Sequence, residues 1–363
     1  MSDTCIVRAE AENFDMDLRE SFAISGGAQE RAANVLVTVT LASGHVGLGE
    51  CAPFPAFNGE TQADVLAEFR KVLPLLDGAD ASDFRALARR LGEATHSGAL
   101  RFGLDTAILD AVCRRFGTPM PLVFGGSTGG TLRSDITITA GDVAHARTSA
   151  REAARRGFDT LKVKVGAGSA HEDVARILAI HEEAPLAAFI LDANGAYDVG
   201  TAKDVLDRLS HVPIALFEQP TPGGEDDVRA LAEVRAHAAK RGTKVAADES
   251  VNGVGDLARL VGAVDVVNVK PSKSGLVGAA DLAVAALGAG FGLMIGGMVE
   301  SSLAMSASAS LAVGIGRFTF VDLDTPLFFA DAPLEGGMRY DGATIHVDRC
   351  IPGHGVRLRA RTP

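Results

Sequence analysis

Between about residues 135 and 324 the chain repeats one pattern of hydrophobic and polar positions. A short apolar run ends in polar residues, an amphipathic stretch rich in Ala, Leu, Glu and Arg follows, and the next run begins. Strands that alternate with helices indicate βαβ units and a parallel sheet. Eight such runs with seven helical segments between them favour a closed barrel over an open doubly wound sheet. The predicted strands are 136–138, 161–165, 189–191, 214–217, 245–247, 264–269, 293–295 and 318–321.

The first 130 residues follow a different pattern, typical of an α+β unit. An alternating strand over 35–40 and a continuation over 46–49 flank a turn at Gly44, which predicts a hairpin. Three helices are expected, over 62–75, 83–93 and 100–116. The end of the chain is loop-like and then β-like at 344–347, too short for a domain of its own. We therefore expect it to pack back on the first unit.

These patterns predict an α/β protein in which a TIM-like (β/α)7-8 barrel carries an N-terminal α+β domain. We place the N-terminal domain at residues 1–130 and the barrel with the active site at 131–326. The C-terminal segment, 327–363, is expected to complete the N-terminal domain.

Composition narrows the possible classes of protein. The chain has 47% hydrophobic and 22% charged residues, which excludes a disordered chain. No apolar stretch reaches the roughly 18–20 residues of a membrane helix, and no signal peptide is evident. A net charge of −11 disfavours nucleic acid as a partner. The four cysteines are far apart without a CxxC pair, so a disulfide framework is not expected and a cytoplasmic location is the simplest interpretation.

Charged residues recur at the predicted strand ends, about one βα repeat apart. Because active sites of such barrels lie at the carboxyl ends of the strands, these side chains should face one cavity. They are Lys162 and Lys164 on strand two, Asp192 on strand three, Glu218 on strand four, Asp248 on strand five and Lys270 on strand six.

Three carboxylates on adjacent strands predict a divalent cation, because they are costly to bury unless something neutralises them. Oxygen ligands with positions open to water and substrate suit Mg²⁺. A substrate carboxylate on that ion would become more acidic at its α-carbon, since the cation stabilises the enediolate. Lys164 and Lys270 could then exchange the α-proton from opposite faces. The metal and Lys162 are expected to lower the lysine pKa. A single Asp at a strand end is more often a helix cap than a ligand, whereas the regular spacing argues against that for the set.

This pattern resembles the muconate-lactonising-enzyme subgroup of the enolase superfamily, over essentially the whole chain. The resemblance implies that Asp192, Glu218 and Asp248 are the metal ligands. It also implies that Lys164, in the motif Lys162–Val163–Lys164, and Lys270 are the two bases. It further implies an N-terminal capping domain with two mobile loops, here about residues 19–32 and 53–61, and a homo-oligomer.

Strand eight distinguishes activities within the subgroup. Asp322 and Asp324 resemble the Asp-x-Asp signature of dipeptide epimerases, which holds the α-ammonium of the dipeptide. Residues i and i+2 share a face, and two carboxylates suit a cation with three donors. Gly297 and Met298 resemble the strand-seven segment, with Gly297 where Cys or Ser is usual.

The capping loops contribute two further predicted substrate-binding positions, Gly27 in the first and Pro53 at the start of the second. Gly27 stands where epimerases of alanyl-glutamate carry an arginine. That substitution argues against a dipeptide restricted to glutamate, although Arg19 or Arg31 could supply the charge.

The leading hypothesis is a Mg²⁺-dependent dipeptide epimerase, an isomerase that inverts the α-carbon of the C-terminal residue by two-base 1,1-proton transfer. The alternatives on the same scaffold are N-acylamino-acid racemisation, o-succinylbenzoate synthesis and cycloisomerisation. Their substrates lack a free ammonium, so Asp322 and Asp324 would have no cation to bind. A non-catalytic binding protein on a decayed enzyme is a third possibility, which the complete set of acids and lysines argues against.

Overall fold

A computed structural model describes residues 2–24, 27–126, 129–139, 141–224 and 227–360, and it describes no side chain of residues 20–28. Its N-terminal part is a three-stranded antiparallel sheet of β1 (Ile6–Ile24), β2 (Gly27–Leu41) and β3 (Val46–Cys51). Four helices follow: α1 (Pro55–Asn58), α2 (Gln62–Leu76), α3 (Phe84–Ala94) and α4 (Gly98–Phe116). The predicted hairpin and all three longer predicted helices are therefore present.

The predicted first capping loop has a different structure. The backbones of β1 and β2 stay paired through most of residues 19–32, with Asp17 opposite Arg31 and Ala23 opposite Ala28. Outside residues 25–26, this segment therefore belongs to two paired strands rather than to a loop. Charged residues alternate along β1, and this concealed the strand from an analysis based on hydrophobic runs.

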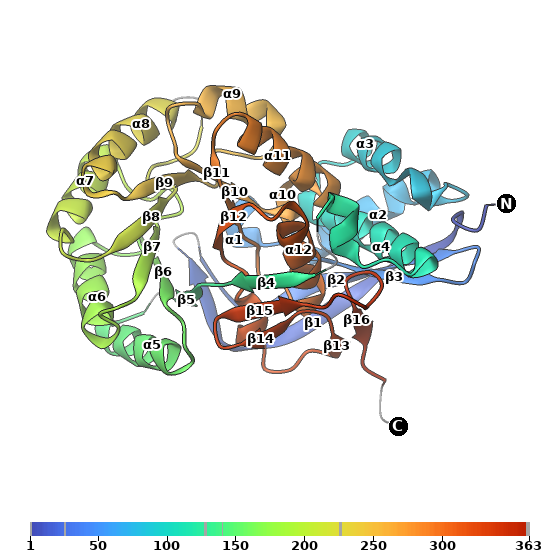
Figure 1. Ribbon diagram of the computed structural model, residues 1–363, viewed down its shortest axis with the longest axis horizontal. Coiled ribbons are helices and arrows are strands. Elements are labelled where there is room, and N and C mark those ends of the chain that lie inside the picture. The colour runs from blue at the N-terminus through green and yellow to red at the C-terminus, as the bar shows by residue number, and fades with distance from the viewer. Residues whose placement is uncertain (1, 25–26, 127–128, 140, 225–226, 361–363) are drawn as a thin grey trace.

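The second part confirms the predicted barrel (Figure 1). Its eight parallel strands lie in sequence order in one curled sheet, with helices on the outside. The strands are β5 (Ile136–Ile138), β6 (Thr160–Lys164), β7 (Ala188–Asp192), β8 (Ile214–Glu218), β9 (Lys244–Ala247), β10 (Val266–Val269), β11 (Gly292–Ile295) and β12 (Phe318–Val321). The helices are α5 (Val143–Arg155), α6 (Ala170–Glu183), α7 (Val199–Arg208), α8 (Asp227–Ala238), α9 (Leu257–Leu260), α10 (Pro271–Ser274), α11 (Leu276–Gly288) and α12 (Ser302–Ile315).

The barrel closes where the start of β5 meets the end of β12. The Asp135 N–H donates to Val321 O (2.8 Å), and the Leu323 N–H donates to the Ser134 hydroxyl oxygen (3.2 Å). A short 3₁₀ turn, Thr325–Phe328, follows β12 where the βα pattern would place a longer helix. Residues 134–137 therefore run beside residues 321–324, although almost 190 residues separate them in sequence.

The C-terminal segment returns to the N-terminal part, as the sequence predicts. The strands β14 (Arg339–Asp341) and β15 (Thr344–Val347) form a sheet with β4 (Gly130–Arg133). The last pair, β13 (Leu334–Gly336) and β16 (Val356–Leu358), packs beside α4, where Arg114 Nη2 donates to Val356 O (2.7 Å).

Helix α4 joins the two parts and is buried over most of its length. Its first residue, Gly98, touches α10 so closely that a Cβ there would lie 2.4 Å from Ser272 O. Arg101, one turn later, donates to Lys273 O (2.9 Å). The capping domain thereby holds the short helix that follows the sixth barrel strand.

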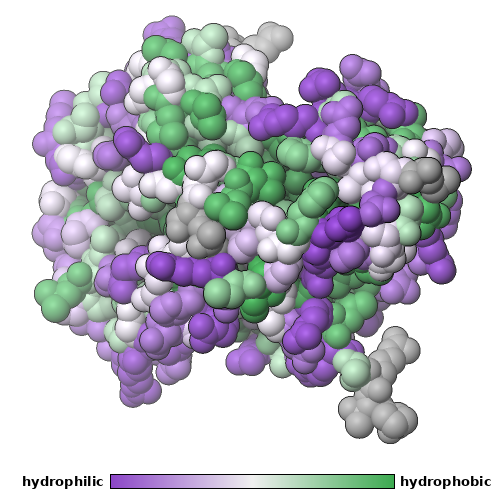
Figure 2. Space-filling model, turned by 45° about the vertical axis from the view of Figure 1, so that its right-hand side comes forward, coloured by the Kyte–Doolittle hydropathy of each residue, from purple (hydrophilic) through white to green (hydrophobic). Residues whose placement is uncertain are grey.

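Polar residues predominate at the periphery of the face in Figure 2, while apolar residues gather near its middle. None of the described helices is long and apolar enough to cross a membrane. Cys5, Cys51 and Cys113 are buried, Cys350 is exposed, and all four are free thiols.

Candidate active site

The structure brings the predicted lysines and acids together at the carboxyl ends of adjacent strands. In the sheet register Lys164 lies opposite Asp192, which lies opposite Glu218. Asp248 and Lys270 directly follow β9 and β10. The βα repeat explains this arrangement, because each repeat returns the chain to the next strand in the same direction. All of these side chains are buried.

Lysine ammonium groups lie among the carboxylates. Lys162 Nζ is 2.9 Å from Asp192 Oδ2 and 2.8 Å from Glu218 Oε2. Lys164 Nζ is 2.7 Å from Asp192 Oδ2, and Lys270 Nζ is 2.7 Å from Asp248 Oδ2. Each acid is thus held by a cation, as a buried carboxylate requires.

In this metal-free environment the pKa values of Lys162 and Lys270 are raised, whereas the sequence analysis expected a bound metal to lower the lysine pKa. Burial by itself lowers the pKa of Lys162, but the charges of Asp192, Asp322, Glu218 and Asp135 outweigh it and raise the pKa well above its ordinary value. The pKa of Lys270 is also raised, because attraction to Asp248 and Glu218 outweighs burial. Burial, together with the charge of Asp192, raises the pKa of Glu218 to about 7. Without a divalent cation the carboxylates therefore hold protons on Lys162 and Lys270.

Lys273 is a functional candidate that the sequence analysis missed. Its ammonium donates to Asp248 Oδ1 and to Asp248 O. The signal was its position three residues after Lys270, on the first turn after a strand end. Lys273 and Lys270 both lie 5.7 Å from the ring centre of Phe57.

Two residues shortly after the acids adopt a left-handed backbone conformation, Asn194 (φ 44°) and Gln219 (φ 33°). Such conformations are uncommon outside glycine and cluster at functional sites. Gln219 Oε1 accepts from the Asp248 N–H (2.9 Å), so it fixes the end of β9 to the end of β8. Asn194 faces the pocket and donates to Glu249 Oε1 (3.1 Å).

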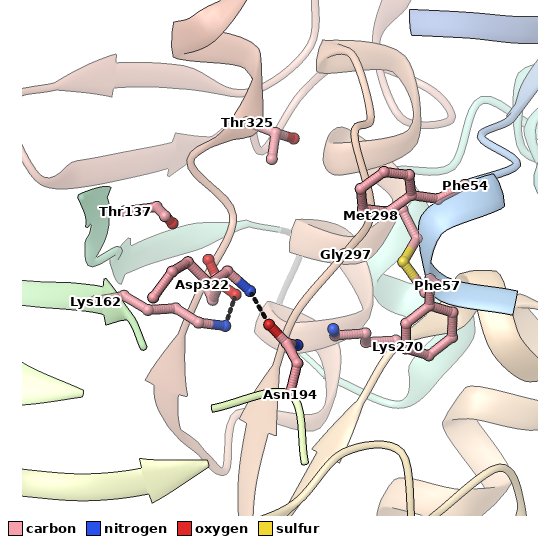
Figure 3. Close-up of a pocket in the computed structure, with 11 residues that line it drawn as sticks. Phe54, Phe57, Thr137, Lys162, Asn194, Lys270, Gly297, Met298, Asp322 and Thr325 are labelled. Atoms are coloured by element: carbon pink, nitrogen blue, oxygen red, sulfur yellow. Dashed lines mark hydrogen bonds and ion pairs between the residues drawn. The ribbon is translucent and has the colours of Figure 1, made fainter. Parts of the chain in front are cut away.

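A pocket opens above the lysines, and its two sides differ in polarity (Figure 3). Lys162, Asp322 and Thr137 lie on one side, whereas Phe54, Phe57 and Met298 gather on the other, near Lys270. Thr137, Phe54, Phe57 and Thr325 are lining residues that the sequence analysis did not select. The predicted positions Gly297 and Met298 do line the pocket, and a Cβ at Gly297 would lie 2.5 Å from Met305 Cε.

Of the two predicted capping positions, Gly27 and Pro53, Pro53 is not among the described residues that line the pocket. Pro53 directly precedes Phe54, and it is Phe54 that lines the pocket. Gly27 lies among the residues of which only the backbone is described. Arg31 pairs with Asp15 and Asp17, and Arg19 Nε donates to Phe329 O (2.8 Å).

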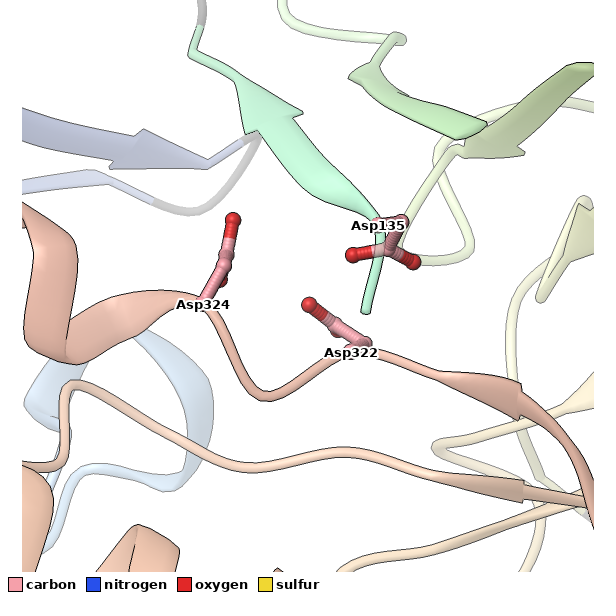
Figure 4. A group of neighbouring side chains, drawn as sticks. All are labelled: Asp135, Asp322 and Asp324. Carbon is pink, nitrogen blue, oxygen red and sulfur yellow. The ribbon is translucent and has the colours of Figure 1, made fainter. Parts of the chain in front are cut away.

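A second group of acids, Asp135, Asp322 and Asp324, lies at the barrel closure (Figure 4). Lys162 Nζ is 2.7 Å from Asp322 Oδ2, and Asp324 Oδ2 accepts from the Thr137 N–H (2.5 Å). Asp135 faces both from the other side of the barrel closure. In the described part of the chain, these are the three acids whose ligand atoms all lie within 4.8 Å of one another, close enough for a shared cation. Asp135 is a further residue that the sequence analysis did not select.

Two family matches cover most of the chain. Residues 145–362 match the enolase C-terminal domain-like family, and residues 8–125 match the mandelate racemase/muconate lactonizing enzyme N-terminal domain. The chain belongs to the enolase superfamily. This confirms the predicted family and its two-part fold.

Curated relatives in this superfamily align over nearly the full length. An aromatic dipeptide epimerase of Herpetosiphon aurantiacus is 45% identical over 98% of this chain and 99% of its own. A hydrophobic dipeptide epimerase of Citrifermentans bemidjiense is 36% identical over 94% of this chain and 95% of its own. The solved structure of a Cytophaga hutchinsonii dipeptide epimerase, complexed with Mg and D-Ala-L-Val, has a TM-score of 0.92 and 29% identity, covering 98% of this chain and 97% of that chain. The relatives' names agree with the predicted enzyme class, an isomerase.

Proposed function

We propose that this protein is a Mg²⁺-dependent dipeptide epimerase that inverts the α-carbon of a C-terminal residue with an apolar or aromatic side chain. The division of the pocket in Figure 3 carries the proposal. A polar side that carries the Asp322 carboxylate suits a free ammonium, and an apolar side at Phe54, Phe57 and Met298 suits the second side chain. The relatives that act on aromatic and hydrophobic dipeptides support this assignment.

The residues present fit a magnesium ion. Asp192, Glu218 and Asp248 provide oxygen ligands on three adjacent strands, and each is held by a lysine ammonium where a metal could supply the charge. Asn268 Nδ2 donates to Glu218 Oε1 (2.7 Å) and orients it. A Mg²⁺ ion bound there would make the α-proton of the substrate more acidic.

The two lysines would carry the proton. Lys164 on β6 and Lys270 after β10 are separated by three strands of the barrel, so they approach the cavity from different sides. One lysine takes the α-proton and the other returns one to the opposite face. Lys162, between Asp322 and Glu218, would bind the substrate carboxylate once a metal replaces it on the acids.

The test is a dipeptide library incubated in deuterated water and read by mass shift. We expect deuterium at the α-carbon of the C-terminal residue and loss of its stereochemical purity. Dipeptides with apolar or aromatic C-terminal residues should react fastest. If N-acylamino acids exchange and free dipeptides do not, the chain is an N-acylamino-acid racemase instead.

A further inference from the structure

The side chain of Asp135 faces the interior of the barrel. It lies two residues before Thr137, which lines the pocket, and residues i and i+2 of a strand share a face. The backbone hydrogen bond from Asp135 to Val321 O sets β5 against the segment that carries Asp322 and Asp324. Asp135 is 1% exposed and Asp324 is 0% exposed. A carboxylate at this depth needs a partner.

That partner is not found among the described residues. Neither carboxylate oxygen of Asp135 has a hydrogen-bond donor, and Oδ1 of Asp324 has none. Figure 4 shows the three carboxylates facing a shared space. Lys162 is the nearby cation, but it contacts Asp192 and Glu218 as well as Asp322. Three buried acids therefore share part of one ammonium group.

The three acids lie close enough together to share one cation, because a ligand atom of each lies within 4.8 Å of those of the other two. An ammonium has three donors, one for each carboxylate.

We propose that Asp135 is a third carboxylate for the substrate ammonium, beside Asp322 and Asp324. This rests on the proposed function, because it assumes a substrate with a free amino terminus. Asp135 lines a neighbouring cavity rather than the pocket itself. Its two carboxylate oxygens and Oδ1 of Asp324, which have no donor, would accept hydrogen bonds from the ammonium group beside Asp322.

The experiment compares kcat/KM for one good dipeptide and its N-acetyl form on wild type and Asp135→Asn. Asparagine keeps the size of the side chain and removes its charge. We expect the free dipeptide to lose about 10-fold or more, chiefly through KM, since a hydrogen bond to a charged group is lost. The N-acetyl form should be unaffected, so the preference for a free amino terminus falls. Asp135→Ser, also neutral, should give the same result and replaces Asp135→Asn if that variant does not fold.

Two comparisons make the result specific. Asp324→Asn should lower the same preference, whereas Asp105→Asn changes another buried carboxyl on α4, outside the pocket, and should leave it unchanged. Titration calorimetry with Mg²⁺ and no substrate should give the same affinity for Asp135→Asn as for wild type.

Several outcomes would overturn the proposal. An unchanged preference in Asp135→Asn would mean that Asp135 is neutral or structural, and loss of Mg²⁺ binding would assign the three acids to a metal. If wild type turns over dipeptides and only the Asp135 effect is missing, this inference alone fails. If wild type exchanges no dipeptide, the proposed function fails with it.

Discussion

Glu50 in the capping sheet binds Ser301 at the start of the barrel helix α12. Its Oε2 accepts from the Ser301 hydroxyl (2.5 Å) and its Oε1 from the Ser301 N–H (3.1 Å). Asn34 donates to the same carboxylate (2.7 Å) and to Val299 O (3.0 Å). Anions are stabilised at a helix N-terminus, so this contact fixes the segment that carries Met298 to the capping domain.

Replacing Glu50 with Gln should therefore weaken both the fold and the pocket. An amide nitrogen would face donors that now find an acceptor, which costs about 1–3 kcal/mol for a buried group. We expect a lower free energy of unfolding in urea and a higher KM for dipeptides. Glu10→Gln, at an exposed glutamate on β1, is the control and should stay within about 0.5 kcal/mol of wild type. Equal stability of the two variants would show that the contact is unimportant.

Mg²⁺ binding should depend on Asp248 and not on Asp322 or Asp324, the acids that follow the eighth barrel strand. In the Asp248→Asn variant we expect Mg²⁺ affinity to fall at least about 10-fold and epimerisation to be lost, with the fold retained. Calorimetry measures the affinity and circular dichroism the fold. Asp322→Asn should bind Mg²⁺ like wild type. Full turnover in excess chelator would contradict the metal assignment.

The two lysines should be separable by isotope exchange. Lys164→Ala and Lys270→Ala are each expected to lower epimerisation by about 10²–10⁴-fold, because each removes one proton carrier. The remaining lysine should still exchange the α-proton of one stereoisomer in deuterated water. Opposite stereoisomers should exchange in the two variants. Near wild-type epimerisation by Lys164→Ala would exclude two-base catalysis.

The apolar side of the pocket predicts preference for the second residue. The described lysines next to Phe57, Lys270 and Lys273, are both paired with Asp248. A buried glutamate side chain would then cost several kcal/mol, whereas an aromatic ring would gain contact area. We expect a higher kcat/KM for Xaa-Phe than for Xaa-Glu. In the Phe57→Ala variant the ratio of kcat/KM for Xaa-Phe to that for Xaa-Glu should fall. A screen in which only Xaa-Glu dipeptides react would contradict the prediction.

Asp105 should make stability depend on pH. Burial is the main cause that raises its pKa to about 7, offset in part by hydrogen bonds from the start of α11 and by Arg101. The folded state then holds a proton that the unfolded state releases near pH 4, so stability is lost as pH rises from about 4 to about 7.

Asp105→Asn removes this titration. Relative to wild type, the variant should gain stability as pH rises from 5 to 7, by at most about 1.4 kcal/mol per pH unit, and the difference should level off above about pH 8. Urea unfolding of both proteins at pH 5, 6, 7 and 8 measures the difference. A difference that does not change with pH would mean that Asp105 titrates normally.

The barrel and the order of its acids and lysines could be predicted from the amino-acid sequence, because a βα repeat is a local pattern. Hydrophobic runs mark the strands, and the polar residue that ends each run must lie at the same edge of the sheet. Asp192, Glu218 and Asp248 are therefore assigned to neighbouring strands by their spacing along the chain, and the strand register agrees for Asp192 and Glu218.

The contacts across the barrel closure and the cap depend instead on the tertiary structure. Asp135 meets Asp322 and Asp324 through the register between the first and last barrel strands, and a shift of one residue would turn its side chain to the other face. Nothing local in the sequence fixes that register. The same reason explains why Phe54 lines the pocket beside the predicted Pro53, since the orientation of a capping segment depends on the domain it packs against.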